Sequence, residues 1–434
     1  MPDKPRLAVT TPWHPTPQRP FAGSFVQAST AAVRPLFDRV NLYNTEDWTG
    51  PADPLQARMV ARAYAALTAG GPAGARVTFP PRLAPEDYWV TDIPVPVTPR
   101  RTYADWALSH ESALRAVLPG GRFEADVVHG HVGIYGGWLA RRFARPDARV
   151  VLTEHASFLG RILRQPRSRA LYGEALDRAD AVLCVSERLR TELVGEFPAH
   201  AGKISVVPNA VDIAAMPVRP EPVSALNRWI YIGKIAAAKG VTELVEAFAI
   251  AARDSADLRL TLLGSGPLVE PLQARVAELG LVGRVEFHDA VPPQRVFEFL
   301  HTHDLLVHPS KSETFGMTVV EAVGSGMPVL VTRCGGPEET LAGLDGTAGL
   351  LIDVSGDPRV IVEGYLKLDA QRSGLDSARA RAELTARYGS AAVAARLAAV
   401  YGTDAGAGAG IPADATAGTA AGTTATATAA MEQR

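Results

Sequence analysis

Two glutamates, Glu313 and Glu321, stand eight positions apart in the stretch P-S-K-S-E-T-F-G-M-T-V-V-E-A-V-G-S-G-M-P-V-L-V-T. Phe315 and Gly316 lie between them, at the start of a run with the apolar density of a short helix. A helix N-terminus offers unpaired N–H groups to an anion, and glycine lets a phosphate approach the backbone closely. Carboxylates there would repel phosphate, so we interpret them as hydroxyl binders. The pattern predicts a ligand that is both phosphate and polyol, such as a nucleotide sugar.

Two lysines, Lys234 and Lys239, follow a predicted strand in the segment I-Y-I-G-K-I-A-A-A-K-G. Cleavage of a sugar–phosphate bond leaves growing negative charge on the departing diphosphate, and ammonium groups placed there stabilise the transition state more than the ground state. Gly264 lies in the turn L-G-S-G-P after another predicted strand. This turn has no third glycine, which disfavours a dinucleotide fingerprint. A plain tight turn and a contact with the donor nucleotide both remain open for Gly264.

The first half of the chain contains histidines at a predicted strand end, in D-V-V-H-G-H-V-G-I-Y-G-G. The carboxyl edge of an α/β sheet is where such sheets bind ligands, and His129 and His131 would lie there. No further ligands with suitable spacing follow nearby, which disfavours zinc. His155, in T-E-H after the next predicted strand, either lines the same cleft or satisfies local backbone groups.

Alternating strands and helices must position these residues. Strands are predicted at 7–10, 40–42, 127–128, 150–152 and 181–185, and again at 229–232, 258–263, 285–287, 305–307, 329–331 and 350–352. Helices are predicted at 25–34, 138–143, 172–179, 318–323 and 382–397, the last broken at 389–390. The alternation predicts an α/β protein with doubly wound sheets. The Pro-rich link 217–222 favours two domains, 1–212 and 213–388. Residues 403–434 are mostly Ala, Gly and Thr, with almost no large apolar residue, and we expect disorder there.

Taken together, the motifs of the second half resemble the donor-site signature of retaining glycosyltransferases of family 4. The pattern is E-x-F-G, a second glutamate eight positions after the first, G-x-P-V and G-G-x-x-E, found here at 313–316, 321, 326–329 and 335–339. The resemblance spans nearly everything from residue 7 to 401. It implies the GT-B fold, in which two Rossmann-like domains face each other across a cleft, with a last helix (about 389–402) completing the first domain.

The resemblance also implies roles on the donor side. Glu313 would hold the sugar hydroxyls and Glu321 the ribose hydroxyls. The backbone amides after Phe315 would stabilise the departing diphosphate, together with the two lysines. Lys234 takes the place of the family's arginine, so a bidentate clamp becomes a point charge. The amides concerned belong to Gly316, Met317 and Thr318.

On the other side of the cleft, the motif D-v-v-H-x-H implies that His131 faces the donor sugar and the leaving phosphate, while His129 is structural. His155 matches the family's T-x-H. Gly23, in P-F-A-G-S-F, resembles the glycine of a loop that meets the diphosphate and the acceptor. A plain helix-start glycine is the alternative. Four arginines at 161, 164, 167 and 169 form either a solvated, ion-paired face or a contact for an anionic acceptor or a membrane surface.

Composition restricts the remaining choices. The 434 residues, 21% charged and 47% hydrophobic with a net charge of −2, describe a globular protein with no electrostatic case for nucleic acid. We expect a buried thiol at Cys184, no membrane span, and a cytoplasmic location with peripheral membrane contact left open. No D-x-D pair is present, so no metal cofactor is expected. Oligomeric state is left open.

The sequence therefore predicts a hexosyltransferase that moves a hexose or N-acetylhexosamine from a nucleotide sugar, with UDP the default nucleotide, to a hydroxyl acceptor. A small polyol or aminocyclitol of an antibiotic pathway is one acceptor class, favoured by a composition typical of GC-rich genomes. Phospholipid and polysaccharide acceptors are alternatives. Two other classes of protein stay open: a GT-B UDP-sugar epimerase acting without an acceptor, and a non-catalytic sugar-nucleotide-binding module.

Overall fold

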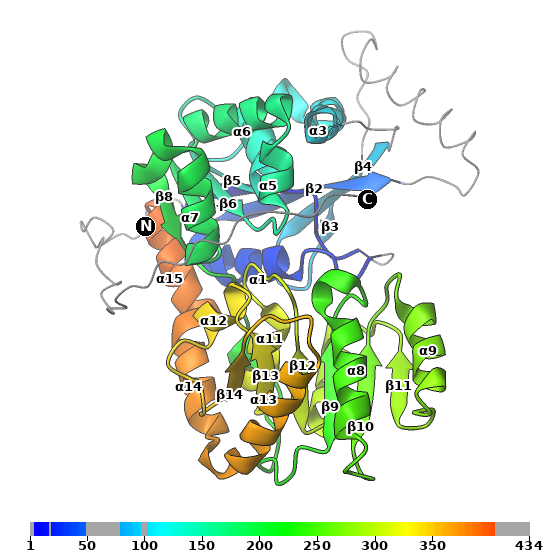
Figure 1. Ribbon diagram of the computed structural model, residues 1–434. Helices are drawn as coiled ribbons and strands as arrows, with labels where there is room; N and C mark the ends of the chain where they lie inside the picture. Colours follow the sequence, from blue (N-terminus) through cyan, green and yellow to red (C-terminus); the bar gives the residue numbers. More distant parts are fainter. Residues whose placement is uncertain (1–3, 17–18, 49–78, 97–101, 404–434) are drawn as a thin grey trace.

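The computed structural model describes residues 4–16, 19–48, 79–96 and 102–403. It contains two α/β units, one above the other in Figure 1, each built on its own sheet. The predicted α/β class with two parallel-sheet domains is confirmed. The expectation of disorder for the C-terminal segment falls on residues that, from 404 onward, lie outside the described part.

The first unit has an eight-stranded sheet in the described residues. Its strands are β1 (Arg6–Thr11), β2 (Arg39–Trp48), β3 (Arg82–Leu83), β4 (Trp89–Pro96), β5 (Val127–His131), β6 (Arg149–Glu154), β7 (Ala181–Cys184) and β8 (Ile204–Val206). They are arranged β3-β4-β2-β1-β5-β6-β7-β8, and all pairs are parallel except β3 with β4. The chain order therefore reverses between β1 and β5, which is a topological switch point.

Helices cover both faces of this sheet. They are α1 (Ser24–Val33), α3 (Tyr103–Val117), α4 (Trp138–Phe143), α5 (Leu159–Leu163), α6 (Pro166–Arg178) and α7 (Glu187–Glu196). One face packs Leu114 of α3, Leu139 of α4 and Tyr172 of α6 into a single buried cluster. The opposite face buries Val26 and Val33 of α1. Because of this two-sided cover, β1 and β5 are buried along almost their whole length.

The second unit has a six-stranded, fully parallel sheet. Its strands are β9 (Arg228–Ile232), β10 (Arg259–Leu263), β11 (Val285–His288), β12 (Leu305–His308), β13 (Val329–Thr332) and β14 (Gly349–Ile352). The spatial order β11-β10-β9-β12-β13-β14 is the dinucleotide-fold order 3-2-1-4-5-6. Its switch point lies between β9 and β12, the strands that precede the two lysines and Glu313.

The remaining helices complete this unit and return to the first. They are α8 (Val241–Ala251), α9 (Val269–Glu278), α10 (Pro293–Thr302), α11 (Met317–Gly324), α12 (Gly336–Thr340), α13 (Arg359–Ala370), α14 (Ser377–Tyr388) and α15 (Ser390–Tyr401). Figure 1 shows α14 beside the second unit and α15 (orange) beside the first. Gly389, between them, is extended at ψ 148 and breaks the helical path. Val393 and Leu397 of α15 are buried with the residues of β1.

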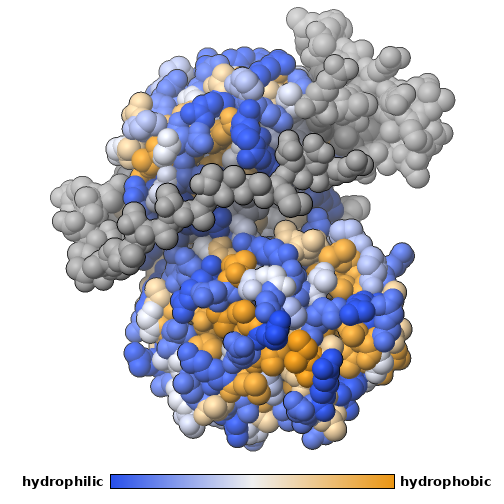
Figure 2. Space-filling view, viewed as in Figure 1, coloured by the Kyte–Doolittle hydropathy of each residue, from blue (hydrophilic) through white to orange (hydrophobic). Residues whose placement is uncertain are grey.

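Surface properties agree with the composition. On the face shown in Figure 2, hydrophobic residues of the second unit lie among hydrophilic ones, as is common on protein surfaces. No helix of the described residues combines the length and the apolar character that crossing a membrane would need. Both cysteines are free and buried, which confirms the prediction for Cys184.

Candidate active site

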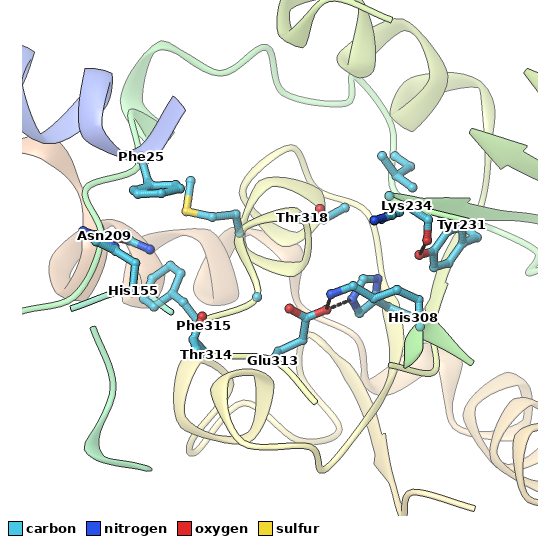
Figure 3. A pocket seen from close by; sticks show the side chains of 15 residues that line it. Phe25, His155, Asn209, Tyr231, Lys234, His308, Glu313, Thr314, Phe315 and Thr318 are labelled. Carbon is cyan, nitrogen blue, oxygen red and sulfur yellow. Dashed lines mark hydrogen bonds and ion pairs between the residues drawn. The ribbon is translucent and has the colours of Figure 1, made fainter. Parts of the chain in front are cut away.

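The candidate site lies between the two units, outside the carboxyl ends of β9 and β12. On the second unit, β9 ends at Ile232 just before Lys234, and β12 ends at His308 five residues before Glu313. The loop after β12 leads into α11. Ligands of open α/β sheets bind in the crevice outside such strand ends. Figure 3 shows the side chains that gather there.

Glu313 is the most constrained group of the site. Its Oε1 accepts from Lys239 Nζ at 2.5 Å and from His308 Nε2 at 3.0 Å. Burial opposes ionisation of this carboxyl, but the hydrogen bond and charge of His308 and the charge of Lys239 lower the pKa of Glu313 to about 2. The side chain is therefore an anion at neutral pH, and its second oxygen is available to accept from hydroxyl groups.

His308 was not identified from the sequence, although it acts directly on Glu313. It is the last residue of β12 and is buried, with its ring stacked on that of Tyr231 at 5.7 Å between centroids. The Tyr231 hydroxyl in turn donates to the backbone oxygen of Lys234 at 2.8 Å. A histidine ending a buried apolar run was the available signal. His308 and Tyr231 together hold the Glu313 carboxylate and the Lys234 backbone in fixed positions relative to each other.

The N-terminus of α11 faces the same space. Gly316 precedes this helix with φ 89, a left-handed conformation that glycine adopts without strain. Gly316, Met317 and Thr318 all line the cavity beside Glu313. Phe315 also lines it, while its ring, which is 2% exposed, packs edge-on against Tyr388. The helix tip therefore presents its free amides next to a carboxylate, as the sequence predicts.

Two adjoining cavities make up the site. The smaller, about 230 Å³, contains Glu313, Lys239 and the helix tip, and the larger is about 470 Å³. They lie next to each other, because five residues line both: Ile232, Gly233, Lys234, Met317 and Thr318. The combined size suits a ligand that is larger than a sugar alone.

The larger cavity is apolar with a single acid. Its apolar wall consists of Leu263, Ala290, Val291, Pro293, Val296 and Phe297. Glu321 lines it too, and burial raises the pKa of Glu321 to about 7. The two glutamates of the motif thus differ: Glu313 is held ionised by its partners, whereas no side chain in the described part of the chain pairs with Glu321. Gly264 also lines this cavity, and a Cβ there would lie 1.9 Å from the Gly233 oxygen, so its small size is required for packing as well.

Lys234 lies where the cavities join. It is exposed, and it makes no ion pair within the described part of the chain. Lys239, by contrast, is already paired with Glu313. The ammonium of Lys234 is therefore the cation that remains free for an anionic ligand.

The first unit supplies the facing wall. Phe25, His155 and Asn209 line the smaller cavity and lie across from Lys234 and Tyr231 in Figure 3. The His155 ring is 4.4 Å from that of Phe25. Burial lowers the pKa of His155 to about 3, so this wall is neutral at pH 7.

Comparison with known proteins agrees with this arrangement. The families described as Glycosyl transferases group 1 and Glycosyltransferase Family 4 match residues 219–384 and 58–215. A D-inositol 3-phosphate glycosyltransferase of Thermobispora bispora is 30% identical over 318 residues, covering 66% of this chain and 72% of the relative. The chain belongs to glycosyltransferase family 4.

Two further similarities of this glycosyltransferase are informative. A 2-deoxystreptamine glucosyltransferase of Streptomyces kanamyceticus is 31% identical over 205 residues, covering 45% of the chain and 53% of the relative. The crystal structure of Anabaena HepE in complex with UDP-glucose has a TM-score of 0.62 at 17% identity, covering 92% of this chain and all of that one. The structural likeness shows the GT-B fold.

The predicted histidines of this glycosyltransferase differ in their position relative to the cavities. His131 is not among the residues that line either cavity; its Nδ1 lies 2.9 Å from His155 Nε2. Such a bond needs one donor and one acceptor, and burial lowers the pKa of His131 well below its usual value. His129 bridges Tyr401 Oη and Thr153 Oγ1, both at 2.7 Å. In this structure His155, rather than His131, forms the cavity wall.

Gly23 has a clear local reason to be glycine. It precedes α1 with φ 68, and a Cβ there would lie 2.1 Å from the Trp13 oxygen. Gly23 itself lines neither cavity, whereas its neighbours Phe21 and Ser24 line the larger one. The loop therefore contributes Phe21 and Ser24 to the cavity wall, whereas the predicted Gly23 does not line it.

The way in which the loop carrying His155 is fixed could not be predicted from the sequence. The buried Glu154 accepts from three backbone amides, of Gly133 at 3.0 Å, His155 at 2.8 Å and Ala156 at 2.7 Å, and from the Tyr172 hydroxyl at 2.6 Å. One carboxylate thus ties together the loops after β5 and β6.

The remaining predictions concern charge and metal. Arg167 pairs with Asp105 at 3.1 Å and Arg169 with Glu196, while Arg161 lies over the Phe158 ring. Arg164 is exposed. Within the described ranges, no group of three or more His, Cys, Asp or Glu side chains is arranged to hold a metal ion.

Proposed function

We propose that this glycosyltransferase transfers a hexose or N-acetylhexosamine from a UDP-sugar to a hydroxyl acceptor, with retention at the anomeric carbon and without a metal. The observation that carries the proposal is that the two cavities adjoin at Lys234 and the tip of α11, which line both. A carboxylate lies at one end of this space and an apolar wall at the other. The similar fold of HepE, which was crystallised with UDP-glucose, supports the choice of donor.

The residues that line the two cavities favour one orientation of the donor. The pyranose occupies the smaller cavity, where the second oxygen of Glu313 accepts from its hydroxyls. The diphosphate lies at the junction, against the amides of α11 and the ammonium of Lys234. The nucleoside occupies the larger cavity, with the base on the apolar wall and the ribose near Glu321.

Transfer then proceeds by exchange of one bond. The bond from the anomeric carbon to the diphosphate oxygen breaks, and a bond from the acceptor oxygen to that carbon forms on the same face. The acceptor proton passes to an oxygen of the leaving phosphate. Developing charge on that phosphate is stabilised by Lys234 and the helix tip. Glu313 offsets part of the charge of Lys239, so Lys239 both fixes the carboxylate and adds a smaller share to this stabilisation.

The acceptor enters from the first unit and meets a neutral wall. We propose a small polyol or aminocyclitol, in antibiotic biosynthesis. Two relatives are named for acceptors of this kind, inositol 3-phosphate and 2-deoxystreptamine. Phe25 and the neutral His155 line this side of the cavity, and uncharged rings suit the C–H face of a cyclitol better than a polyphosphate.

A matrix of donors and acceptors tests the proposal. UDP-glucose, UDP-galactose and UDP-N-acetylglucosamine are each incubated with 2-deoxystreptamine, myo-inositol or inositol 3-phosphate, and products are detected by mass spectrometry. We expect a glycosylated acceptor with wild type and none with Glu313→Gln. Conversion of donor to a new sugar without any acceptor would instead identify an epimerase. Binding of UDP without turnover of any donor would identify a binding module.

A further inference from the structure

The G-G-x-x-E motif has no part in the cavities that would explain its glutamate. Glu339, in α12, instead reaches the first unit. Its Oε2 accepts from the Glu187 amide at 2.7 Å and its Oε1 from the Arg188 amide at 2.8 Å. These are the first amides of α7, where a carboxylate is favoured by the helix dipole. A side chain of the second unit thus caps a helix of the first.

Arg188 makes the reciprocal contact. Its Nη1 donates to the backbone oxygen of Cys334 at 2.6 Å, and lies 3.3 Å from that of Glu313 and 3.2 Å from Ser312 Oγ. All three acceptors belong to the second unit. A single guanidinium group of the first unit therefore contacts two segments of the second unit, the loop that carries Glu313 and the segment that follows β13.

Those acceptors are part of the donor site's own framework. The Glu313 amide donates to the Cys334 oxygen at 3.2 Å, and the Gly336 amide donates to the Glu313 oxygen at 3.0 Å. Arg188 joins this pair of bonds at both oxygens. The position of the Glu313 backbone is thereby tied to α7, and α7 follows the strand β7 of the first sheet.

The two glycines of the motif make this approach possible. Gly335 has φ 112, and a Cβ there would lie 2.4 Å from Arg188 Nη1. A Cβ on Gly336 would lie 2.4 Å from the Phe315 nitrogen. One glycine thus makes room for the guanidinium and the other for the loop that leads into α11. The glycines of the motif are therefore explained by their close contacts with Arg188 and Phe315.

We propose that Arg188 and Glu339 form an interdomain latch that positions Glu313 opposite the His155 wall; the catalytic consequence rests on the proposed function. Neither residue lines the two cavities that hold the donor. They are positioning residues. Loss of the latch leaves the nucleotide cavity intact and misplaces the carboxylate relative to the acceptor side. A displacement of about 1 Å in such a site lowers rates by up to about 10²-fold.

Arg188→Ala is compared with Arg190→Ala, which removes an arginine of the same helix whose carboxylate partner among the described residues is Glu187, at 2.8 Å. Glu339→Gln is compared with Glu338→Gln, its exposed neighbour.

For the two latch variants we expect kcat for transfer to fall about 10- to 100-fold, donor hydrolysis to rise relative to transfer, and the Kd for UDP to stay within about twofold. The controls should match wild type. Arg188→Lys, which lacks the planar fork, provides a milder variant if Arg188→Ala does not fold.

A second readout needs no substrate. Hydrogen exchange followed by mass spectrometry reports the amides of Glu313 and Gly336, and we expect exchange at least about tenfold faster in Arg188→Ala than in Arg190→Ala. Faster exchange with no transfer by wild type would refute the proposed function while supporting the latch. Unchanged exchange and an unchanged kcat in Arg188→Ala would overturn the latch while leaving the proposed function standing.

Discussion

The two walls of the cleft differ in charge. The wall from the second unit carries Lys234, Lys239 and Glu313, and the pKa of Glu313 is lowered to about 2 by its partners. The wall from the first unit presents His155, and burial lowers its pKa to about 3. At neutral pH one wall is therefore ionic and the other is neutral, although both are built on polar side chains.

This difference separates two tasks. Charge is concentrated on the side where a diphosphate would leave, and the helix tip of α11 lies there too. The neutral side is aromatic and internally hydrogen-bonded through His131 and His155, so it can orient an acceptor and exclude water without competing for the anion. Substitutions on the two walls should consequently produce different kinds of defect.

The largest effect is expected on the charged wall. Glu313→Gln and Lys239→Ala should each lower the transfer rate by at least about 10²-fold, because each removes a preorganised charge at the reacting centre. Initial rates with a saturating donor measure this. Lys311→Ala is the matched control, since Lys311 pairs with Glu243 at 2.7 Å and lines neither cavity. Variants as active as this control would remove Glu313 and Lys239 from the mechanism.

Stability should depend on pH in opposite directions at His155 and at Glu321. The pKa of His155 falls from 6.5 to about 3 on folding, so the unfolded state takes up a proton that the folded state excludes. Stability is therefore lost as pH falls below about 6.5, by about 1.4 kcal/mol per pH unit for one such group. His155→Gln should flatten this loss in urea unfolding between about pH 6 and 4. Parallel curves for wild type and variant would contradict the neutral state of His155.

Glu321 should change the pH dependence of stability in the opposite direction to His155. Its pKa rises from 4.5 to about 7 on folding, so its contribution is present below about pH 4.5 and is lost as pH rises through about 7. Because the side chain lines an open cavity, solvent screening reduces the effect to about 1–2 kcal/mol. Glu321→Gln should remove that loss in the same urea series. A variant that gains no stability over wild type at pH 7 would show that Glu321 ionises freely.

The smallest effect is expected where the first unit touches the apolar cavity. Phe21 is 44% exposed and lines the larger cavity, where its ring can cover a bound base. Phe21→Ala should raise the Kd for UDP about fivefold to tenfold by loss of stacking, as measured by calorimetry. Leu83→Ala, an exposed apolar side chain of the first unit outside both cavities, is the control. Equal affinities would place the base away from Phe21.

Most of the fold could be predicted from the sequence because local pattern determines it. The helix expected at 25–34 is α1 at Ser24–Val33, and the six strands of the second sheet lie where apolar runs predict them. The donor side could be predicted for a related reason. Glu313, the helix tip and Glu321 occupy one short segment, so their spacing in sequence fixes their spacing in space.

The first-unit wall could not be predicted to the same depth. Which of His131 and His155 reaches the cavity depends on the packing of two adjacent strands, and nothing local to either residue decides it. Val132 illustrates the limit, because it adopts φ 68 although a β-branched residue disfavours that region. Asn209 and Arg188 meet segments far away in the chain, and only the tertiary structure brings them together.

The central claim is that charge on the second unit holds the diphosphate of a nucleotide sugar. A crystal structure with UDP tests it most directly. We predict phosphate oxygens within hydrogen-bond distance of Lys234 Nζ and of the amides at the start of α11, with the uracil against Val291 and Val296. A UDP molecule bound elsewhere, with Lys234 and the helix tip facing solvent, would contradict the account.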